Sequence, residues 1–209
     1  MAKIKELFSK YWDDILKPVV VLLSICIVIP LALAVTDSVT KDKIAELETK
    51  KSNETMESLV ESDRFEEAEL GEENTVIYHK ALKGEETVGY IFITKAKGYG
   101  GDVSVMTAVN IDGTVKSVAI LDVSNETPGL GQNAAKEAFY SQYEGKKEGI
   151  KLLKNGAVAE NNEIDAVTGA TITSTAVTEA VNEALEQFKI IKSLSSTYIP
   201  ESEVAVSEE

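Results

Sequence analysis

An uncharged apolar run near the N-terminus most constrains how this chain can fold. Residues 18–35 read PVVVLLSICIVIPLALAV, in which Ser24 and two prolines are the only interruptions. The run is long enough to cross a bilayer as a helix, at the short end of the usual range. A cleaved signal peptide is the alternative, because residues 32–34 (Ala-Leu-Ala) resemble a small-x-small cleavage site. Residues 1–17 are amphipathic and mix acidic residues with four lysines, unlike a short basic leader, so we favour a retained anchor.

Charge does not decide which way this anchor points. Four lysines precede the span and four follow it within residues 36–52, so the positive-inside count is a tie. A long acidic domain can be translocated largely regardless of its charge. The sequence therefore permits a cytoplasmic N-terminus with the following domain outside, without requiring it.

The overall composition excludes several functional classes. Asp and Glu number 35 against 21 Lys and Arg, and the net charge of -14 repels nucleic-acid phosphate, so we expect no nucleic-acid partner. One Cys and one His cannot form a disulfide, an iron-sulfur ligand set or a multi-His metal cage, so no metal site is expected. Any redox chemistry would therefore come from a bound organic cofactor.

Behind the anchor, the sequence predicts a stalk and one α+β domain. Residues 36–70 are rich in Lys, Glu, Ser and Thr and indicate a helical stalk. The domain is expected over 71–197, with an acidic, disordered tail at 198–209. Its β-rich runs predict an antiparallel sheet, and Asp112-Gly113 between two of them is a strong hairpin signal. These runs are 75–82, 87–97, 103–111 and 114–123, and helices are expected over 132–143 and 174–192, the second with one apolar face for packing on the sheet.

Two loops between these elements are informative. Residues 97–101 (Lys-Gly-Tyr-Gly-Gly) combine glycines, which let a backbone approach a ligand closely, with a tyrosine ring for stacking. Residues 125–131 (Asn-Glu-Thr-Pro-Gly-Leu-Gly) contain a Pro-Gly pair that favours a type II turn, which lifts Leu130 to the tip. Taken alone, each is also an ordinary connection.

A third segment, residues 165–175 (Asp-Ala-Val-Thr-Gly-Ala-Thr-Ile-Thr-Ser-Thr), crowds hydroxyl groups at the start of the long helix. Free backbone N–H groups and the positive end of the helix dipole favour an anion there, which indicates a phosphate site. Helix capping explains one hydroxyl but not the others. The segment is not a Walker loop, because no lysine follows the glycine.

Residues 168–173 (Thr-Gly-Ala-Thr-Ile-Thr) resemble the Ser/Thr-Gly-Ala-Thr/Ser-x-Thr motif on which FMN is attached through its phosphate to the last threonine. Residues 98–101 and 126–131 are also similar to segments of the same family, in the same order. That family is the G subunit of the Rnf complex, an ion-translocating ferredoxin:NAD oxidoreductase. The C subunit of the sodium-translocating NADH:quinone reductase is its relative.

The resemblance implies an electron-relay protein of this complex whose FMN is bound covalently at Thr173. It implies a domain on the extracytoplasmic side, partners among the other Rnf-type subunits, and a flavin transferase that uses FAD to make the linkage. Ion translocation would belong to the partner subunits, and no catalytic residue is expected in this chain. The further cofactor-binding residues that the resemblance implies are Tyr99, Gly100, Glu126, Thr127, Pro128, Gly129, Leu130, Gly131, Thr168, Gly169, Ala170 and Thr171.

Three residues have open interpretations. Glu126 could lie near the flavin ring and shift its potential, or it could cap the helix that follows the turn. His79 is interpreted as a packed or solvated strand residue, and Cys26 as an apolar side chain of the anchor.

Two other functions remain possible from the sequence. One is a stand-alone, membrane-anchored extracellular flavin reductase. The other is an anchored binding module without redox activity, in which the hydroxyl cluster only caps a helix.

Overall fold

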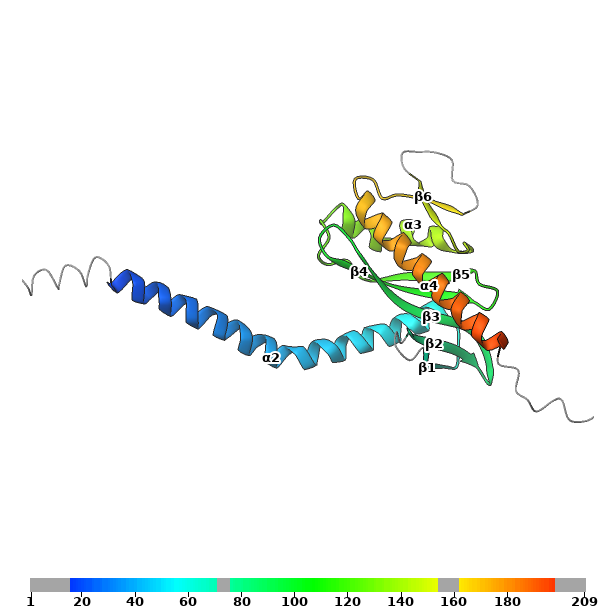
Figure 1. Cartoon of the computed structure of the whole chain (residues 1–209), viewed down its shortest axis with the longest axis horizontal. Coiled ribbons are helices and arrows are strands. Elements are labelled where there is room, and N and C mark those ends of the chain that lie inside the picture. Colours follow the sequence, from blue (N-terminus) through cyan, green and yellow to red (C-terminus); the bar gives the residue numbers. More distant parts are fainter. Residues whose placement is uncertain (1–15, 71–75, 154–161, 198–209) are drawn as a thin grey trace, which may run out of the picture. The chain divides into compact units, whose positions relative to one another are not determined.

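The structure, a computed structural model, describes residues 16–70, 76–153 and 162–197 (Figure 1). The chain divides into two compact units, Met1–Lys51 and Ser52–Glu209. The expected N-terminal segment 1–17 falls almost entirely outside the described residues, and the expected tail 198–209 falls entirely outside them.

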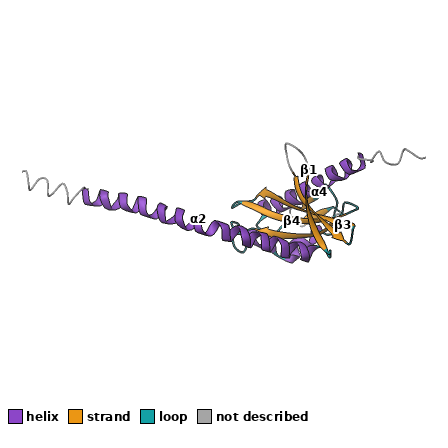
Figure 2. Ribbon diagram, turned by 90° about the horizontal axis from the view of Figure 1, so that it is seen from below, coloured by secondary structure: helices purple, strands orange, loops and turns teal. Residues whose placement is uncertain are grey.

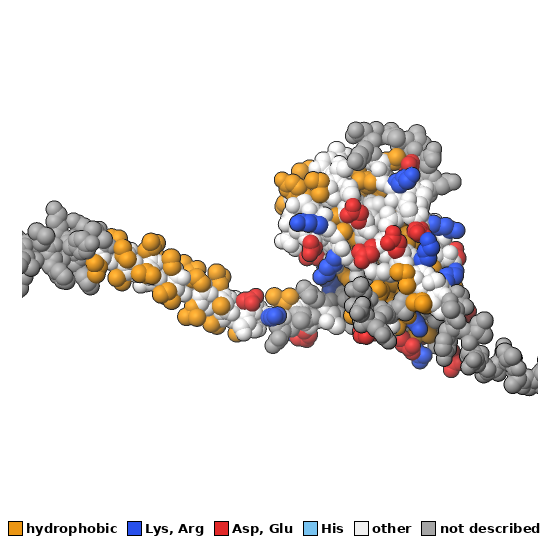
Figure 3. All heavy atoms as spheres, in the orientation of Figure 1, with side chains coloured by type: hydrophobic (Ala, Val, Ile, Leu, Met, Phe, Trp, Pro, Cys, Tyr) orange, Lys and Arg blue, Asp and Glu red, His pale blue; other side chains and the backbone are white. Residues whose placement is uncertain are grey.

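The first unit is built on α2 (Lys17–Leu59), which contains the predicted membrane span. Its stretch Lys17–Lys41 is long and apolar enough to cross a membrane, and its large hydrophobic side chains are exposed (Figure 3). Two hydroxyls in this stretch are satisfied inside the helix: Ser24 donates to the carbonyl of Val20 at 2.7 Å, and Thr36 to that of Ala32 at 2.9 Å. Internal satisfaction is what a hydrocarbon environment demands of polar groups.

The second unit is an α+β domain around a five-stranded antiparallel sheet, as the sequence predicts. The strands follow one another in chain order, each hydrogen-bonded to the next. Gly113, with φ of 84°, forms the predicted tight connection between the fourth and fifth strands. The strands are β1 (Arg64–Leu70), β2 (Val76–Lys83), β3 (Glu86–Lys97), β4 (Asp102–Asn110) and β5 (Val115–Asp122).

Helix α4 (Thr171–Thr197) packs along one face of this sheet (Figures 1 and 2). The apolar residues of α4 recur every three or four positions. They are buried in one cluster with Val103, Val105 and Phe92 of the sheet. Met56 lies in the last turn of α2, and Val60 follows the end of that helix. The two side chains cover the opposite face of the sheet. Strand β4 is therefore buried on both faces: Val103, Val105 and Val109 pack with α4, whereas Met106 and Ala108 pack with Met56 and Val60.

The expected helical stalk over residues 36–70 is wrong for residues 64–70, which form β1. This segment pairs along its whole length with β2, from Arg64 opposite Leu82 to Leu70 opposite Val76. Helix α2 ends at Leu59, where the hydroxyl of Ser117 donates to its carbonyl at 2.9 Å. Pairing with β2 supplies backbone hydrogen bonds that override the local composition of residues 64–70. The compact domain begins still earlier, at Ser52 rather than at residue 71.

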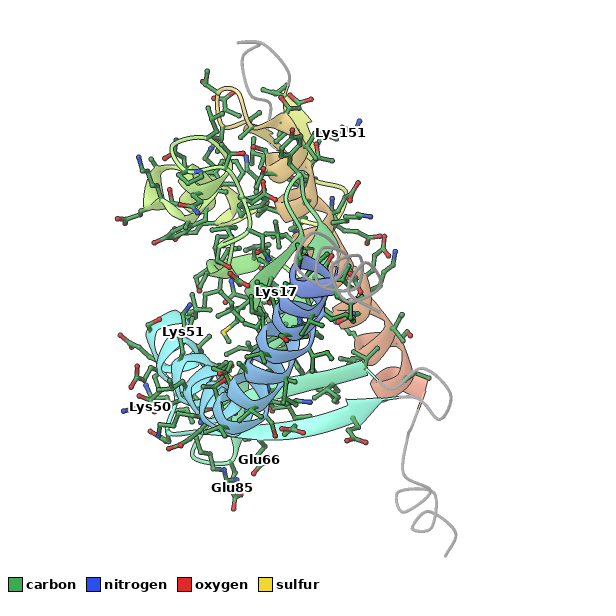
Figure 4. All side chains as sticks on the ribbon, turned by 90° about the vertical axis from the view of Figure 1, so that its left-hand side faces the viewer. Lys17, Lys50, Lys51, Glu66, Glu85 and Lys151 are labelled. Carbon is green, nitrogen blue, oxygen red and sulfur yellow. The ribbon has the colours of Figure 1, made fainter. Side chains whose placement is uncertain are left out.

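The expected helix over 132–143 is also wrong as a single element. It is divided into η2 (Gly131–Ala135), α3 (Glu137–Tyr140) and η3 (Ser141–Tyr143), because the backbone of Lys136 is extended. A short parallel pair, β6 (Lys151–Leu153) and β7 (Glu163–Asp165), completes the described domain. Figure 4 places Lys151 at the end of the domain opposite Glu66 and Glu85.

Candidate functional site

Three segments that are distant in sequence meet at one end of the domain. They are the β3–β4 loop, the turn after β5 and the start of α4. Together they line a cleft of about 590 Å³. Its lining residues are Tyr99, Glu126, Thr127, Leu130, Gly131, Gly169, Ala170, Thr171, Ile172 and Thr173.

A buried hydrogen bond joins two of the segments. The Thr173 hydroxyl donates to Glu126 Oε2 at 2.6 Å, and the two residues are only 1% and 3% exposed. The other carboxylate oxygen, Oε1, accepts the backbone N–H of Gly100 at 3.0 Å. One carboxylate therefore ties the β3–β4 loop to the first turn of α4.

The glycines around this carboxylate are required by close packing. A Cβ at Gly98 would collide with Glu126 Oε1, and a Cβ at Gly100 would collide with the carbonyl of Asn125. A Cβ at Gly131 would lie 2.5 Å from Glu126 Oε2 and 2.7 Å from Thr173 Oγ1. These glycines therefore let two backbone loops close around Glu126, whereas the sequence suggested close approach to a ligand.

The Pro-Gly turn has the conformation that the sequence predicts. The N–H of Leu130 donates to the carbonyl of Thr127 at 3.1 Å, and Gly129 has φ of 77°, as a type II turn requires. Leu130 is 44% exposed and lies at the cleft beside Gly169, where an added Cβ would be 3.1 Å from Leu130 Cδ2.

The hydroxyl cluster divides into structural and cleft-facing members. Ser174 donates to the carbonyl of Ala170 at 2.9 Å and accepts the N–H of Val167 at 3.0 Å. Thr175 and Thr178 each donate to the carbonyl four residues earlier, at 2.8 Å. Only Thr171 and Thr173 bring hydroxyl-bearing side chains of α4 to the cleft.

The start of α4 favours an anion beside Thr171, whereas the Glu126 carboxylate next to Thr173 opposes one. Because the first N–H groups of an α-helix have no partner within the helix, those at the start of α4 are available. The first turn of α4 holds no acidic residue that would compensate the helix dipole.

The structure brings most of the predicted site residues together, but not all of them. Gly100 lies beside the cleft and holds Glu126, while Pro128 and Gly129 shape the turn without lining the cleft. Thr168 lines a separate hollow of about 360 Å³, next to Lys136 and Gln142.

Sequence reasoning missed Ile172 as a cleft residue. Ile172 is 54% exposed. The sequence feature that could have identified it is an apolar residue between two threonines at the start of a helix. The helix-cap interpretation of Glu126 is wrong, since among the described residues its carboxylate bonds to Thr173 and Gly100, and neither η2 nor α3 has a side-chain cap.

His79 and Cys26 lie outside the cleft, on β2 and α2. Burial lowers the pKa of His79 below its usual value, an effect that the neighbouring Glu67 carboxylate opposes. Among the residues that the structure describes, no group of three or more His, Cys, Asp or Glu side chains is arranged to hold a metal ion.

Comparison with known proteins bears directly on this cleft. A family model described as FMN-binding domain matches residues 98–186, a range that contains all the cleft-lining residues. The G subunit of the proton-translocating ferredoxin:NAD(+) oxidoreductase complex of Clostridium ljungdahlii is 37% identical over 164 residues, which cover 78% of this chain and 85% of that protein. The chain belongs to this G-subunit family.

The chain is also similar to a second G subunit and, in part, to a solved structure. The G subunit of the Na(+)-translocating ferredoxin:NAD(+) oxidoreductase complex of Acetobacterium woodii is 34% identical over 203 residues, covering 88% of this chain and 97% of that protein. Among solved structures, the C subunit of the Na(+)-translocating NADH-quinone reductase from Parabacteroides distasonis is 25% identical with a TM-score of 0.49, covering 56% of this chain and 62% of that one.

Proposed function

We propose that this G-subunit protein relays electrons through FMN attached covalently to Thr173, within a membrane-bound complex that couples ferredoxin:NAD electron transfer to ion translocation. The observation that carries the proposal is the position of Thr173 at the start of α4, where it is one of the residues that line the cleft. Membership in the G-subunit family and the match to the FMN-binding domain support it.

The cleft residues fit both ends of FMN. Backbone N–H groups at the start of α4 and the Thr171 hydroxyl would hold the phosphate. Tyr99, Leu130 and Ile172 present exposed apolar surface at the cleft, which would hold the isoalloxazine ring. When bound, FMN supplies the one- and two-electron chemistry that the side chains lack.

The residues of this chain would then bind and orient the cofactor. A phosphoester bond at Thr173 fixes the cofactor at the start of α4, whose packing on the sheet holds that threonine in place. Because α4 is buried over several turns against β3 and β4, the attachment point is rigid. A rigid attachment point suits a relay that must keep fixed distances to its donor and acceptor.

The covalent linkage can be tested by intact mass and peptide mapping after denaturation. The full chain is co-produced with a flavin transferase, which we propose uses FAD as the donor. An FMN adduct is expected on the peptide containing Thr173, and Thr173→Ala should abolish it. Thr175→Ala is the matched control, because Thr175 lies on the same helix outside the cleft and donates to the Thr171 carbonyl, so the adduct should stay in place. A wild-type chain that stays unmodified while the transferase labels a control substrate would refute the linkage.

We also propose that the N-terminus is cytoplasmic and that the FMN domain is extracytoplasmic. Glu85, in the turn between β2 and β3, is exposed and points away from the ribbon (Figure 4), which makes it a suitable labelling position. In a Cys26→Ser background, Glu85→Cys should react with a membrane-impermeant thiol reagent on intact cells. Lys3→Cys should react only after lysis, and the reverse pattern would contradict the orientation.

A further inference from the structure

The Thr173 hydroxyl differs from its neighbours in the direction of its proton. Ser174, Thr175 and Thr178 donate to carbonyl groups of their own helix. Thr173 instead donates out of the helix to Glu126 Oε2 at 2.6 Å. This distance lies within the reach that a general base needs to take a proton from a nucleophile.

The two carboxylate oxygens of Glu126 have different partners, and one of them bonds only to Thr173 among the described residues. The Gly100 N–H fixes Oε1 at 3.0 Å, which leaves Oε2 for the hydroxyl. The missing side chains at Gly98 and Gly131 provide the space that this carboxylate occupies. Helix capping requires none of this, because the pair lies apart from the hydrogen bonds that close the first turn of α4.

We propose that Glu126 is the general base for the modification of Thr173. The inference rests on the proposed covalent linkage and adds the residue that activates its nucleophile. Glu126 Oε2 takes the proton of Thr173 Oγ1 as that oxygen forms its bond to the phosphorus of the flavin-bearing phosphate of FAD. The bond from this phosphorus to the bridging oxygen breaks, and AMP leaves with that oxygen and its electron pair.

The proton transfer also solves an electrostatic problem. An ionised Glu126 beside the new phosphodiester would place two negative charges at one buried position, which is unfavourable. A Glu126 that has accepted the proton is neutral and can donate a hydrogen bond where it previously accepted one. The same residue therefore activates the hydroxyl and tolerates the product.

The test measures the rate of FMN attachment on the full chain, produced without a transferase and purified in detergent. Purified flavin transferase and FAD are added, and the adduct is followed by intact mass. Glu126→Gln keeps the shape of the side chain but cannot accept the proton, so attachment should slow by about 100-fold or more. Glu137→Gln is the matched control, since Glu137 is exposed on α3 and should leave the rate unchanged.

A pH series separates a base from a purely structural residue. The ratio of the wild-type rate to the Glu126→Gln rate should shrink as the pH falls, because a protonated carboxyl group cannot accept a proton. The transferase's own pH dependence cancels in this ratio. A ratio that is large and independent of pH would overturn the proposal in favour of a structural hydrogen bond.

The remaining outcomes are equally decisive. Attachment to Glu126→Gln at the wild-type rate overturns the base but leaves the linkage at Thr173 intact. A wild-type chain that acquires no adduct, with an active transferase, refutes the linkage itself. If circular dichroism shows that Glu126→Gln is unfolded, Glu126→Asp replaces it in the test. This variant moves the carboxylate away from Thr173 by one methylene. A slower attachment rate would support Glu126 as the general base, and an unchanged rate would overturn that role.

Discussion

Glu126 shows how much of this site is decided by single residues and the space around them. Its two carboxylate oxygens are each occupied, one by an amide of the β3–β4 loop and one by the hydroxyl of Thr173. The surrounding glycines are close enough that a methyl group at Gly98 or Gly131 would meet the carboxylate. The geometry of the site therefore depends on how the surrounding residues pack around the buried carboxylate of Glu126.

Gly131→Ala should slow FMN attachment and also destabilise the domain. The new methyl group would lie within 3 Å of Glu126 Oε2, Glu126 Cβ and Thr173 Oγ1, so the buried Glu126–Thr173 pair must separate. The rate is measured by intact mass, and the free energy of unfolding by urea denaturation.

Gly145→Ala, outside the cleft, is the matched control for this substitution. No heavy atom lies within 4 Å of its added Cβ, but its φ of 73° is unfavourable for alanine. It should cost about 1 kcal/mol of stability and leave the attachment rate unchanged. If Gly131→Ala is modified as fast as Gly145→Ala, the crowding at Glu126 has no bearing on the reaction.

At the scale of elements, the site depends on how α4 and the sheet are packed. The buried face of α4 fixes its axis, and thereby fixes where its first turn delivers Thr171 and Thr173. The edge of the sheet is less enclosed: β1 carries three exposed glutamates and pairs only with β2. His79 of β2 lies opposite Glu67 in this pairing.

The β1–β2 pair should make stability depend on pH through His79, the only histidine in the chain. Burial lowers the pKa of His79 below 6.5 in the folded state, and the opposing attraction of Glu67 is the smaller effect. The folded state therefore binds a proton less readily than the unfolded state. The resulting stability is present above pH 6.5 and is lost as the pH falls through the folded pKa.

Urea denaturation between about pH 8 and pH 5.5 checks this, because carboxylates titrate mainly below that range. The free energy of unfolding of the wild-type domain should fall across the range, and His79→Gln should show a flatter profile. Equal slopes for the two proteins would mean that His79 is not the group responsible.

At the scale of the whole molecule, the chain combines an apolar helical unit with a domain that has its own core. The domain unit begins at Ser52, inside the continuous helix α2, so the last turns of that helix belong to it. Met56 and Val60 are 4% and 1% exposed and cover the face of the sheet opposite α4. The boundary between anchor and domain therefore lies within a helix.

A fragment of residues 52–209 should remain soluble without detergent and unfold with the stability of the domain in the full chain. A fragment of residues 61–209 lacks Met56 and Val60 and exposes the apolar surface they cover, including Ile91 and Met106. Each lost side chain contributes about 1.5–3 kcal/mol, so the shorter fragment should be less stable by roughly 3–6 kcal/mol. Urea denaturation of both fragments measures the difference, and equal stabilities would show that these residues are not part of the core.

The sequence by itself determined the features that depend on local pattern. The apolar run predicted the span, alternation and Asp112-Gly113 predicted the strands and one hairpin, and helical spacing predicted the buried face of α4. Pro128-Gly129 predicted the type II turn, because its two residues restrict the backbone directly. These features need only neighbouring residues.

Tertiary structure alone decided the features that depend on distant partners. Residues 64–70 form a strand because they pair with β2, although their own composition favours a helix. Glu126 meets Thr173 across 47 positions of sequence, and Thr168 turns away from the cleft although it belongs to the same motif. Such contacts arise when loops from β3, β5 and α4 close on one another, so no local pattern encodes them.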